Sequence, residues 1–94
     1  MGKTEEEYLH EHRIVVAYGI LKDTVNALQA RYIALSRAAL GDPEEQERWN
    51  TRMLQARDAV LCIDPEDLQA VTDLTERYGT ELRELYRRAT PVRR

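Results

Sequence analysis

Near the start of the chain a glutamate and a histidine stand three positions apart, a spacing that places a carboxylate and an imidazole on one face of a helix. They are Glu7 and His10. Helical bundles that hold two iron ions use this Glu-x-x-His spacing, but a complete site also needs a second such pair and two further glutamates. A metal-binding bundle built on Glu7 and His10 therefore needs a second copy of the chain. The simpler interpretation is the solvated, charged first turn of a long helix, so we predict neither a metal site nor a cofactor.

Arginine supplies most of the positive charge, and its planar guanidinium can bind a carboxylate or a phosphate through two parallel hydrogen bonds. Arg48 and Arg52 flank Trp49, which suits either an anion-binding site or an interface hot spot. The same residues also fit one turn of an ordinary amphipathic helix, because Glu44 and Arg48 have the stabilising i,i+4 spacing and Trp49 falls on its apolar side. We predict the ordinary helix and keep the anion site as an alternative.

The overall charge argues against binding to nucleic acid. The formal net charge is −3 and the isoelectric point is about 5.4, whereas affinity for a phosphate backbone rests on a basic surface. A short basic tail spans residues 90–94, and with Arg87 and Arg88 it gathers four arginines at the end of the chain. We interpret Arg87 and Arg88 as complementing the negative end of the last helix.

Nothing in the sequence indicates export or insertion into a membrane. No apolar run approaches the roughly 18 residues needed to span a bilayer. The opening segment from Met1 to Glu7 is acidic where a secretory signal needs an apolar stretch. A single cysteine, Cys62, cannot form an internal disulfide, so nothing implies an oxidising compartment. We therefore expect a cytoplasmic protein.

Three helix starts can be recognised from a capping residue followed by acidic residues. These are Thr4 with Glu7, Asp42 with Pro43, and Asp64 with Pro65. The first pair forms a capping box, and in the other two pairs the aspartate caps while proline occupies the first helical position, where its missing N–H costs nothing. Gly41 suits a left-handed end to the first helix. The signals predict an all-α fold, one helical domain over residues 1–94, with helices at about 5–40, 43–61 and 65–89.

Apolar residues of the first helix recur at alternating steps of four and three, the spacing of a coiled-coil seam. The seam consists of Ile14, Tyr18, Leu21, Val25, Leu28, Tyr32, Leu35 and Ala39. The later helices repeat this rhythm, so we expect an antiparallel, coiled-coil-like bundle. A second face of the first helix has small side chains that allow close approach of a neighbour. It consists of Ala17, Ile20, Thr24, Ala27, Ala34 and Ala38.

The predicted helices do not match in length. At 1.5 Å per residue the first helix is about 54 Å long and the second about 29 Å, so a folded-back second helix leaves the apolar segment from Arg13 to Leu21 uncovered. If the second and third helices instead run end to end, they cover the whole first helix as a second layer. Each of the two layers then keeps one apolar face without a partner. Both geometries predict a homodimer or a protein partner, and the residues expected at the interface are Ile14, Tyr18, Leu21, Val25, Leu28, Tyr32, Trp49 and Met53. The alternative is a compact monomer whose first helix breaks between Gly19 and Thr24.

The order of a long, a short and a medium helix, together with the stretch from Ile63 to Leu68, resembles the all-α chorismate mutases. That resemblance implies a dimer built around the first helix and a dicarboxylate bound by buried cationic side chains. Arg13 and Arg31 lie on one face of the first helix, and Arg48 would join them in such a pocket, with Arg52 a further candidate. The chain departs from the family pattern at Asp42, where the family needs a lysine, so no active site is carried over.

Taken together, the residues favour a non-enzymatic helical protein–protein interaction module, a small regulator, adaptor or inhibitor that self-associates through its first helix. Two alternatives stay open. One is a small anion-binding enzyme that resembles the chorismate mutases, and the other is a metal-binding bundle that uses Glu7 and His10. We predict that no catalytic residues are present.

Overall fold

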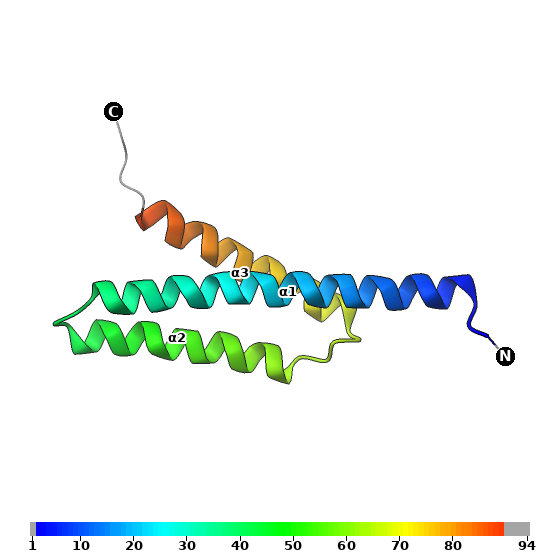
Figure 1. Cartoon of the computed structure of the whole chain (residues 1–94), viewed down its shortest axis with the longest axis horizontal. Coiled ribbons are helices and arrows are strands. Elements are labelled where there is room, and N and C mark those ends of the chain that lie inside the picture. Colours follow the sequence, from blue (N-terminus) through cyan, green and yellow to red (C-terminus); the bar gives the residue numbers. More distant parts are fainter. Residues whose placement is uncertain (1, 90–94) are drawn as a thin grey trace, which may run out of the picture.

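The computed structural model describes residues 2–89, which form the helices α1 (Glu5–Ala38), α2 (Pro43–Cys62) and α3 (Leu68–Ala89) (Figure 1). The prediction of an all-α fold with a long first helix is confirmed. α1 runs for 34 residues through Gly19 and Thr24, so the alternative of a broken first helix is wrong. The basic tail at 90–94 lies outside the described residues.

The start of α1 is set by the residues expected to set it, whereas its end lies two residues earlier than predicted. At the start, the hydroxyl of Thr4 accepts the N–H of Glu7 at 3.2 Å, and the Glu7 carboxylate accepts the N–H of Thr4 at 3.3 Å. After the last turn Gly41 adopts a φ of 95°, a conformation that L side chains rarely tolerate. The helix ends at Ala38 rather than at residue 40, because the backbone of the next residue already departs from helical geometry.

α2 starts where the sequence predicts. Asp42 caps it by accepting the N–H of Glu45 at 3.2 Å, and Pro43 is its first residue. Its end at Cys62 lies one residue beyond the predicted boundary.

α3 begins at Leu68, three residues later than predicted. The assignment of Asp64 as its cap, with Pro65 as the first helical residue, is wrong. The Asp64 carboxylate accepts the N–H two residues further on at 3.0 Å, which closes a turn instead of a helix. Asp67 is the cap, since its carboxylate accepts the N–H of Ala70 at 3.0 Å. Two aspartates three residues apart can each accept a backbone N–H, and the second one caps the helix.

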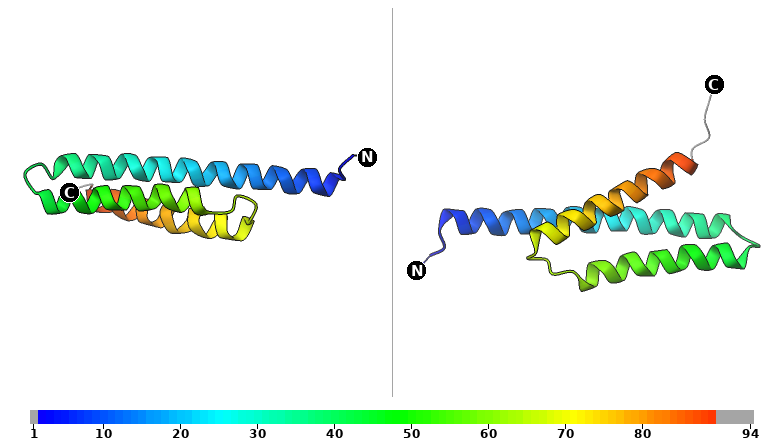
Figure 2. Two further views of the ribbon diagram at one scale, coloured as in Figure 1. Left: turned by 90° about the horizontal axis from the view of Figure 1, so that it is seen from below. Right: turned by 180° about the vertical axis from the view of Figure 1, so that it is seen from behind.

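α1 is the central element of the fold. α2 folds back along the C-terminal half of α1, and α3 then reverses direction and crosses α1 at an angle (Figure 1). Both lie on one side of α1 and leave the opposite side bare, as the left view of Figure 2 shows. The buried core consists of Leu21, Val25, Leu28, Tyr32, Ala56, Val71, Tyr78 and Leu85. α1 supplies half of this core, so each of the other helices is held mainly by α1.

The molecule is elongated and exposes much surface for its size. It measures 62 × 34 × 15 Å, and its radius of gyration is 17.0 Å, against about 12 Å for a compact domain of this length. Its accessible area is 7200 Å², against about 5,600 Å² for a typical monomer of this mass. The first turns of α1 project beyond both other helices (Figures 1 and 2). None of the described helices combines the length and the apolar character that a membrane span requires.

Candidate functional site

A line of apolar side chains follows one exposed face of α1 along its whole length. Its members are spaced seven or four residues apart, which keeps them on one face of a helix. We call this line the apolar stripe, and it consists of Leu9, Val16, Ile20, Ala27, Ala34 and Ala38. The three large members, Leu9, Val16 and Ile20, are 51%, 44% and 52% exposed. Exposed apolar side chains along one helix face form a candidate surface for binding another protein, although Arg13 and Arg31 interrupt this line.

Sequence reasoning found only part of the stripe. The small-residue face predicted for the first helix includes Ile20 and the alanines, but Leu9 and Val16 were not recognised as its continuation. The signal was present, because Leu9 to Val16 and Ile20 to Ala27 are the same seven-residue step.

The residues predicted at the dimer interface mostly build the chain's own core. Leu21, Val25, Leu28 and Tyr32 are buried between α1 and the other two helices. Tyr18, Trp49 and Met53 are half-buried and pack against that core, and Ile14 is half-buried as well. This seam lies about 130° around α1 from the apolar stripe. Any self-association that keeps the fold must therefore use a face other than the centre of the seam.

The four arginines proposed for an anion site have different surroundings. Arg13 is exposed on α1, and the guanidinium of Arg31 stacks over the ring of Tyr86 at 5.2 Å. Arg48 pairs with Glu45 at 2.7 Å within α2. The structure therefore does not gather Arg13, Arg31 and Arg48 around one pocket.

Arg52 is the member of that set that lines a pocket. Its guanidinium stacks over Trp49 at 5.4 Å and lies 3.5 Å from the carboxylate of Glu81 on α3.

The Glu7 and His10 pair at the start of α1 is exposed. The Glu7 carboxylate is engaged in the capping box, where it accepts hydrogen bonds from the backbone and the hydroxyl of Thr4. Among residues 2–89 no group of three or more His, Cys, Asp or Glu side chains could hold a metal ion. The structure thus gives Glu7 a structural role at the helix start.

All three helices contribute to a polar pocket that sequence reasoning missed. This polar pocket has a volume of about 400 Å³ and is lined by Tyr32, Arg52, Gln55, Arg77, Tyr78 and Glu81. The buried rings of Tyr32 and Tyr78 form its floor, while Arg52, Gln55 and Arg77 are exposed around it. Only the crossing of the helices brings these positions together, so no spacing within the sequence could reveal them.

Hydrogen bonding and burial define the electrostatics of the polar pocket. The Tyr32 hydroxyl donates a hydrogen bond to Glu81 at 2.5 Å. Burial of Tyr32, and then this bond and the negative charge of Glu81, raise the pKa of Tyr32 well above its ordinary value of 10.0. Burial also raises the pKa of Tyr78, while the nearby charge of Arg77 opposes the rise and Glu81 adds to it. Both tyrosines are thus protonated hydrogen-bond donors at neutral pH.

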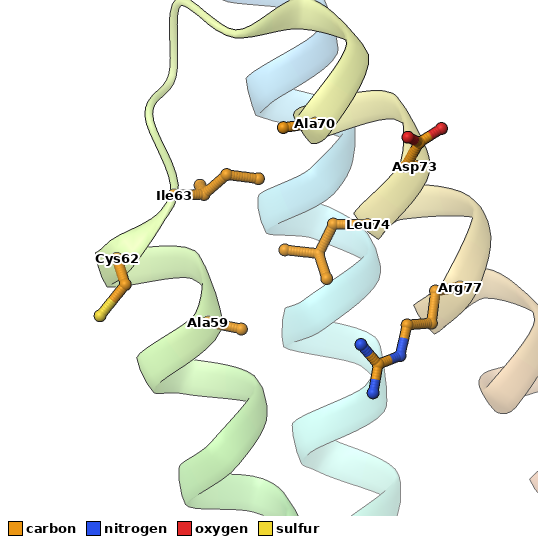
Figure 3. Close-up of a pocket in the computed structure, with 7 residues that line it drawn as sticks. All are labelled: Ala59, Cys62, Ile63, Ala70, Asp73, Leu74 and Arg77. Atoms are coloured by element: carbon orange, nitrogen blue, oxygen red, sulfur yellow. The ribbon is translucent and has the colours of Figure 1, made fainter.

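An apolar groove adjoins the polar pocket between the end of α2 and the start of α3 (Figure 3). It has a volume of about 380 Å³ and is lined by Ala59, Cys62, Ile63, Ala70, Asp73, Leu74 and Arg77. Ile63 and Leu74 point toward each other across the groove, whereas the thiol of the exposed Cys62 points away (Figure 3). Arg77 lines both the groove and the polar pocket, so the two cavities are neighbours.

Comparison with known proteins identified no relative of this chain. No family model, no curated protein and no solved structure matches the chain. The features that bear on function are therefore the apolar stripe, the polar pocket and the apolar groove.

Proposed function

We propose that this chain is a non-enzymatic helical interaction module, a small regulator, adaptor or inhibitor, that forms a homodimer through the apolar stripe of α1. The observation that carries the proposal is the exposure of three large apolar side chains in one line along α1, Leu9 at 51%, Val16 at 44% and Ile20 at 52%. Full burial of a large apolar side chain contributes about 1.5–3 kcal/mol, and these side chains are about half exposed, so each adds roughly half of that on association.

The stripe complements a second copy of itself when the two α1 helices run antiparallel. Its N-terminal half carries the large side chains and its C-terminal half carries alanines. A two-fold axis placed between Leu21 and Lys22 sets Leu9 opposite the partner's Ala34 and Val16 opposite the partner's Ala27. In these two pairs a large side chain faces a small one, as close helix packing requires, whereas Ile20 lies opposite the partner's Asp23.

The same axis also matches charges along the edge of the stripe. It sets the acidic first turn of α1, including Glu6, beside Arg37 in the last turn of the other copy. Two equivalent contacts of this kind arise from one axis, because a two-fold interface repeats every contact. Exposed pairs contribute little energy, but they favour the antiparallel over the parallel arrangement.

The surface area of the chain is compatible with such a dimer. The accessible area exceeds that of a typical monomer of this mass by about 1,600 Å². A standard protein interface buries about 800 Å² on each partner. A dimer interface along α1 therefore fits within the surplus surface.

Two neighbouring valines provide a matched test. Val16 lies on the stripe, while Val15 is 68% exposed and lies about 100° around the helix from it. In sedimentation velocity at tens of micromolar we expect a dimer for the parent chain and for Val15→Glu, and a monomer for Val16→Glu. A monomeric parent chain, or equal dissociation by both variants, would contradict the proposal.

Cysteine cross-linking tests the orientation of the two helices. In a Cys62→Ser background, Val16→Cys combined with Ala27→Cys brings thiols within disulfide range of each other when the helices run antiparallel. Val16→Cys alone should cross-link only in a parallel dimer. We expect an oxidised dimer on a non-reducing gel for the double variant and not for the single one, and cross-linking of the single variant overturns the antiparallel arrangement.

A further inference from the structure

We propose that the polar pocket and the apolar groove together bind one small amphipathic oxyanion, with its carboxylate or phosphate head in the pocket and its apolar body along the groove. Both cavities lie on the side of α1 that carries α2 and α3. Binding there is separate from association through the apolar stripe.

Charge makes the polar pocket selective for an anion. Arg52 and Arg77 bring two positive charges to it, and Glu81 brings one negative charge. Glu81 is already engaged, since it accepts the Tyr32 hydroxyl at 2.5 Å and lies 3.5 Å from Arg52. Arg77 packs over the ring of Tyr78 at 5.9 Å, and no carboxylate among residues 2–89 forms an ion pair with it. One positive charge is left for a ligand.

Neutral donors complete the recognition of a head group with several oxygens. Tyr78 brings a hydroxyl to the floor of the pocket and Gln55 brings an amide to its edge. The guanidinium of Arg77 can donate two parallel hydrogen bonds to a carboxylate or a phosphate. These donors around one free positive charge match an oxyanion rather than a cation or an uncharged polar group.

The apolar groove determines the rest of the ligand. Ala59, Ile63, Ala70 and Leu74 give it apolar walls (Figure 3), and Arg77 lines both the groove and the polar pocket. The Asp73 carboxylate, which also lines the groove, accepts a hydrogen bond from the Gln69 amide at 2.8 Å. The two cavities, of about 380 and 400 Å³, are each within the range of small-molecule sites. A ligand whose head contacts Arg77 can therefore extend its apolar body between Ile63 and Leu74.

Binding can be followed through the single tryptophan of the chain. Trp49 stacks on Tyr32 at 5.9 Å and carries Arg52 over its ring, so a head group in the polar pocket changes its surroundings. We expect octanoate or octyl phosphate to give a saturable change in Trp49 fluorescence, confirmed by calorimetry. Acetate and inorganic phosphate lack the apolar body, and 1-octanol lacks the charge, so all three should bind at least about tenfold more weakly.

Comparing the two head groups identifies the natural source of the oxyanion. Tighter binding of octanoate indicates a carboxylate, and tighter binding of octyl phosphate indicates a phosphate monoester. If neither gives a saturable signal in fluorescence or calorimetry, or if 1-octanol binds as tightly as both, the proposal is overturned.

A pair of arginine variants locates the site. Arg77→Met keeps the apolar stem and removes the charge, and it should weaken binding of the better probe by about tenfold or more. Arg83→Met is the matched control on the same helix, where Arg83 is exposed and donates a hydrogen bond to Thr80. Circular dichroism checks that both variants fold. Unchanged affinity in folded Arg77→Met, or equal losses in both variants, overturns the assignment.

Discussion

The N-terminal and C-terminal halves of α1 carry similar apolar residues, but the two halves have opposite surroundings. From Leu21 onward α1 packs against both α2 and α3, and Leu21 and Leu28 are completely buried. Before Leu21 the helix carries Leu9 and Val16 about half exposed. The difference arises because α2 and α3 are shorter than α1 and both pack toward its C-terminal half (Figure 1). Identical side chains thus stabilise the fold in one half and remain available for association in the other.

The first and largest test of this comparison uses one leucine from each half. Leu28→Ala leaves a cavity in the core and should lower the free energy of unfolding by about 2–5 kcal/mol. Leu9→Ala removes a half-exposed side chain and should change it by no more than about 0.5 kcal/mol in dilute protein. Urea denaturation followed by circular dichroism measures both values. Similar losses for the two variants would show that the N-terminal half is packed within the single chain.

The second test uses pH and the tyrosines of the two halves. Because the pKa of Tyr32 is raised in the folded state, its protonation stabilises the fold fully below pH 10, and this contribution is lost as the pH rises further. The free energy of unfolding should fall above pH 10 by up to about 1.4 kcal/mol per pH unit on account of this group. Tyr32→Phe should remove that component, while Tyr8→Phe, at a 59% exposed position, controls for the loss of a hydroxyl. If the free energy of unfolding falls with pH above 10 as steeply in Tyr32→Phe as in the parent chain, ionisation of Tyr32 does not contribute to stability.

The third and smallest test compares two helix caps. Asp42→Ala removes the cap of α2, which packs along its length on α1, and should lower global stability by about 1 kcal/mol. Thr4→Ala removes the capping box of a turn that projects beyond the other helices, so we expect local fraying with little global effect. Hydrogen exchange should show lost protection confined to the first turns of α1. If Thr4→Ala lowered the free energy of unfolding as much as Asp42→Ala does, the N-terminal turns of α1 would unfold together with the rest of the protein.

Much of the secondary structure could be predicted because its signals are local. The capping box at Thr4 and the Asp42 and Pro43 start each depend on a few neighbouring residues, and both are confirmed. Gly41 is left-handed as expected, but the helix already ends at Ala38. The start of α3 could not be predicted, because Asp64 and Asp67 can each accept a backbone N–H and the path of the connecting chain decides which of them caps the helix.

The functional features divide in the same way. The seam of α1 was recognised from its spacing, but periodicity states only that a face is apolar and cannot tell whether the chain itself or a second molecule covers it. Arg52 was singled out for its residue type, whereas its pocket partners Arg77, Tyr78 and Glu81 lie on α3, more than twenty residues away in sequence.

The sequence by itself determined that this chain forms three helices, that the first is much longer than the others, and that the first bears apolar residues on more than one face. These properties follow from capping, propensity and spacing, which act over a few residues. The tertiary structure alone decided which apolar face became the core, which stretch of α1 stayed exposed, and which arginines meet the buried tyrosines. Those outcomes depend on where α2 and α3 cross α1, and that is set by packing between residues distant in sequence.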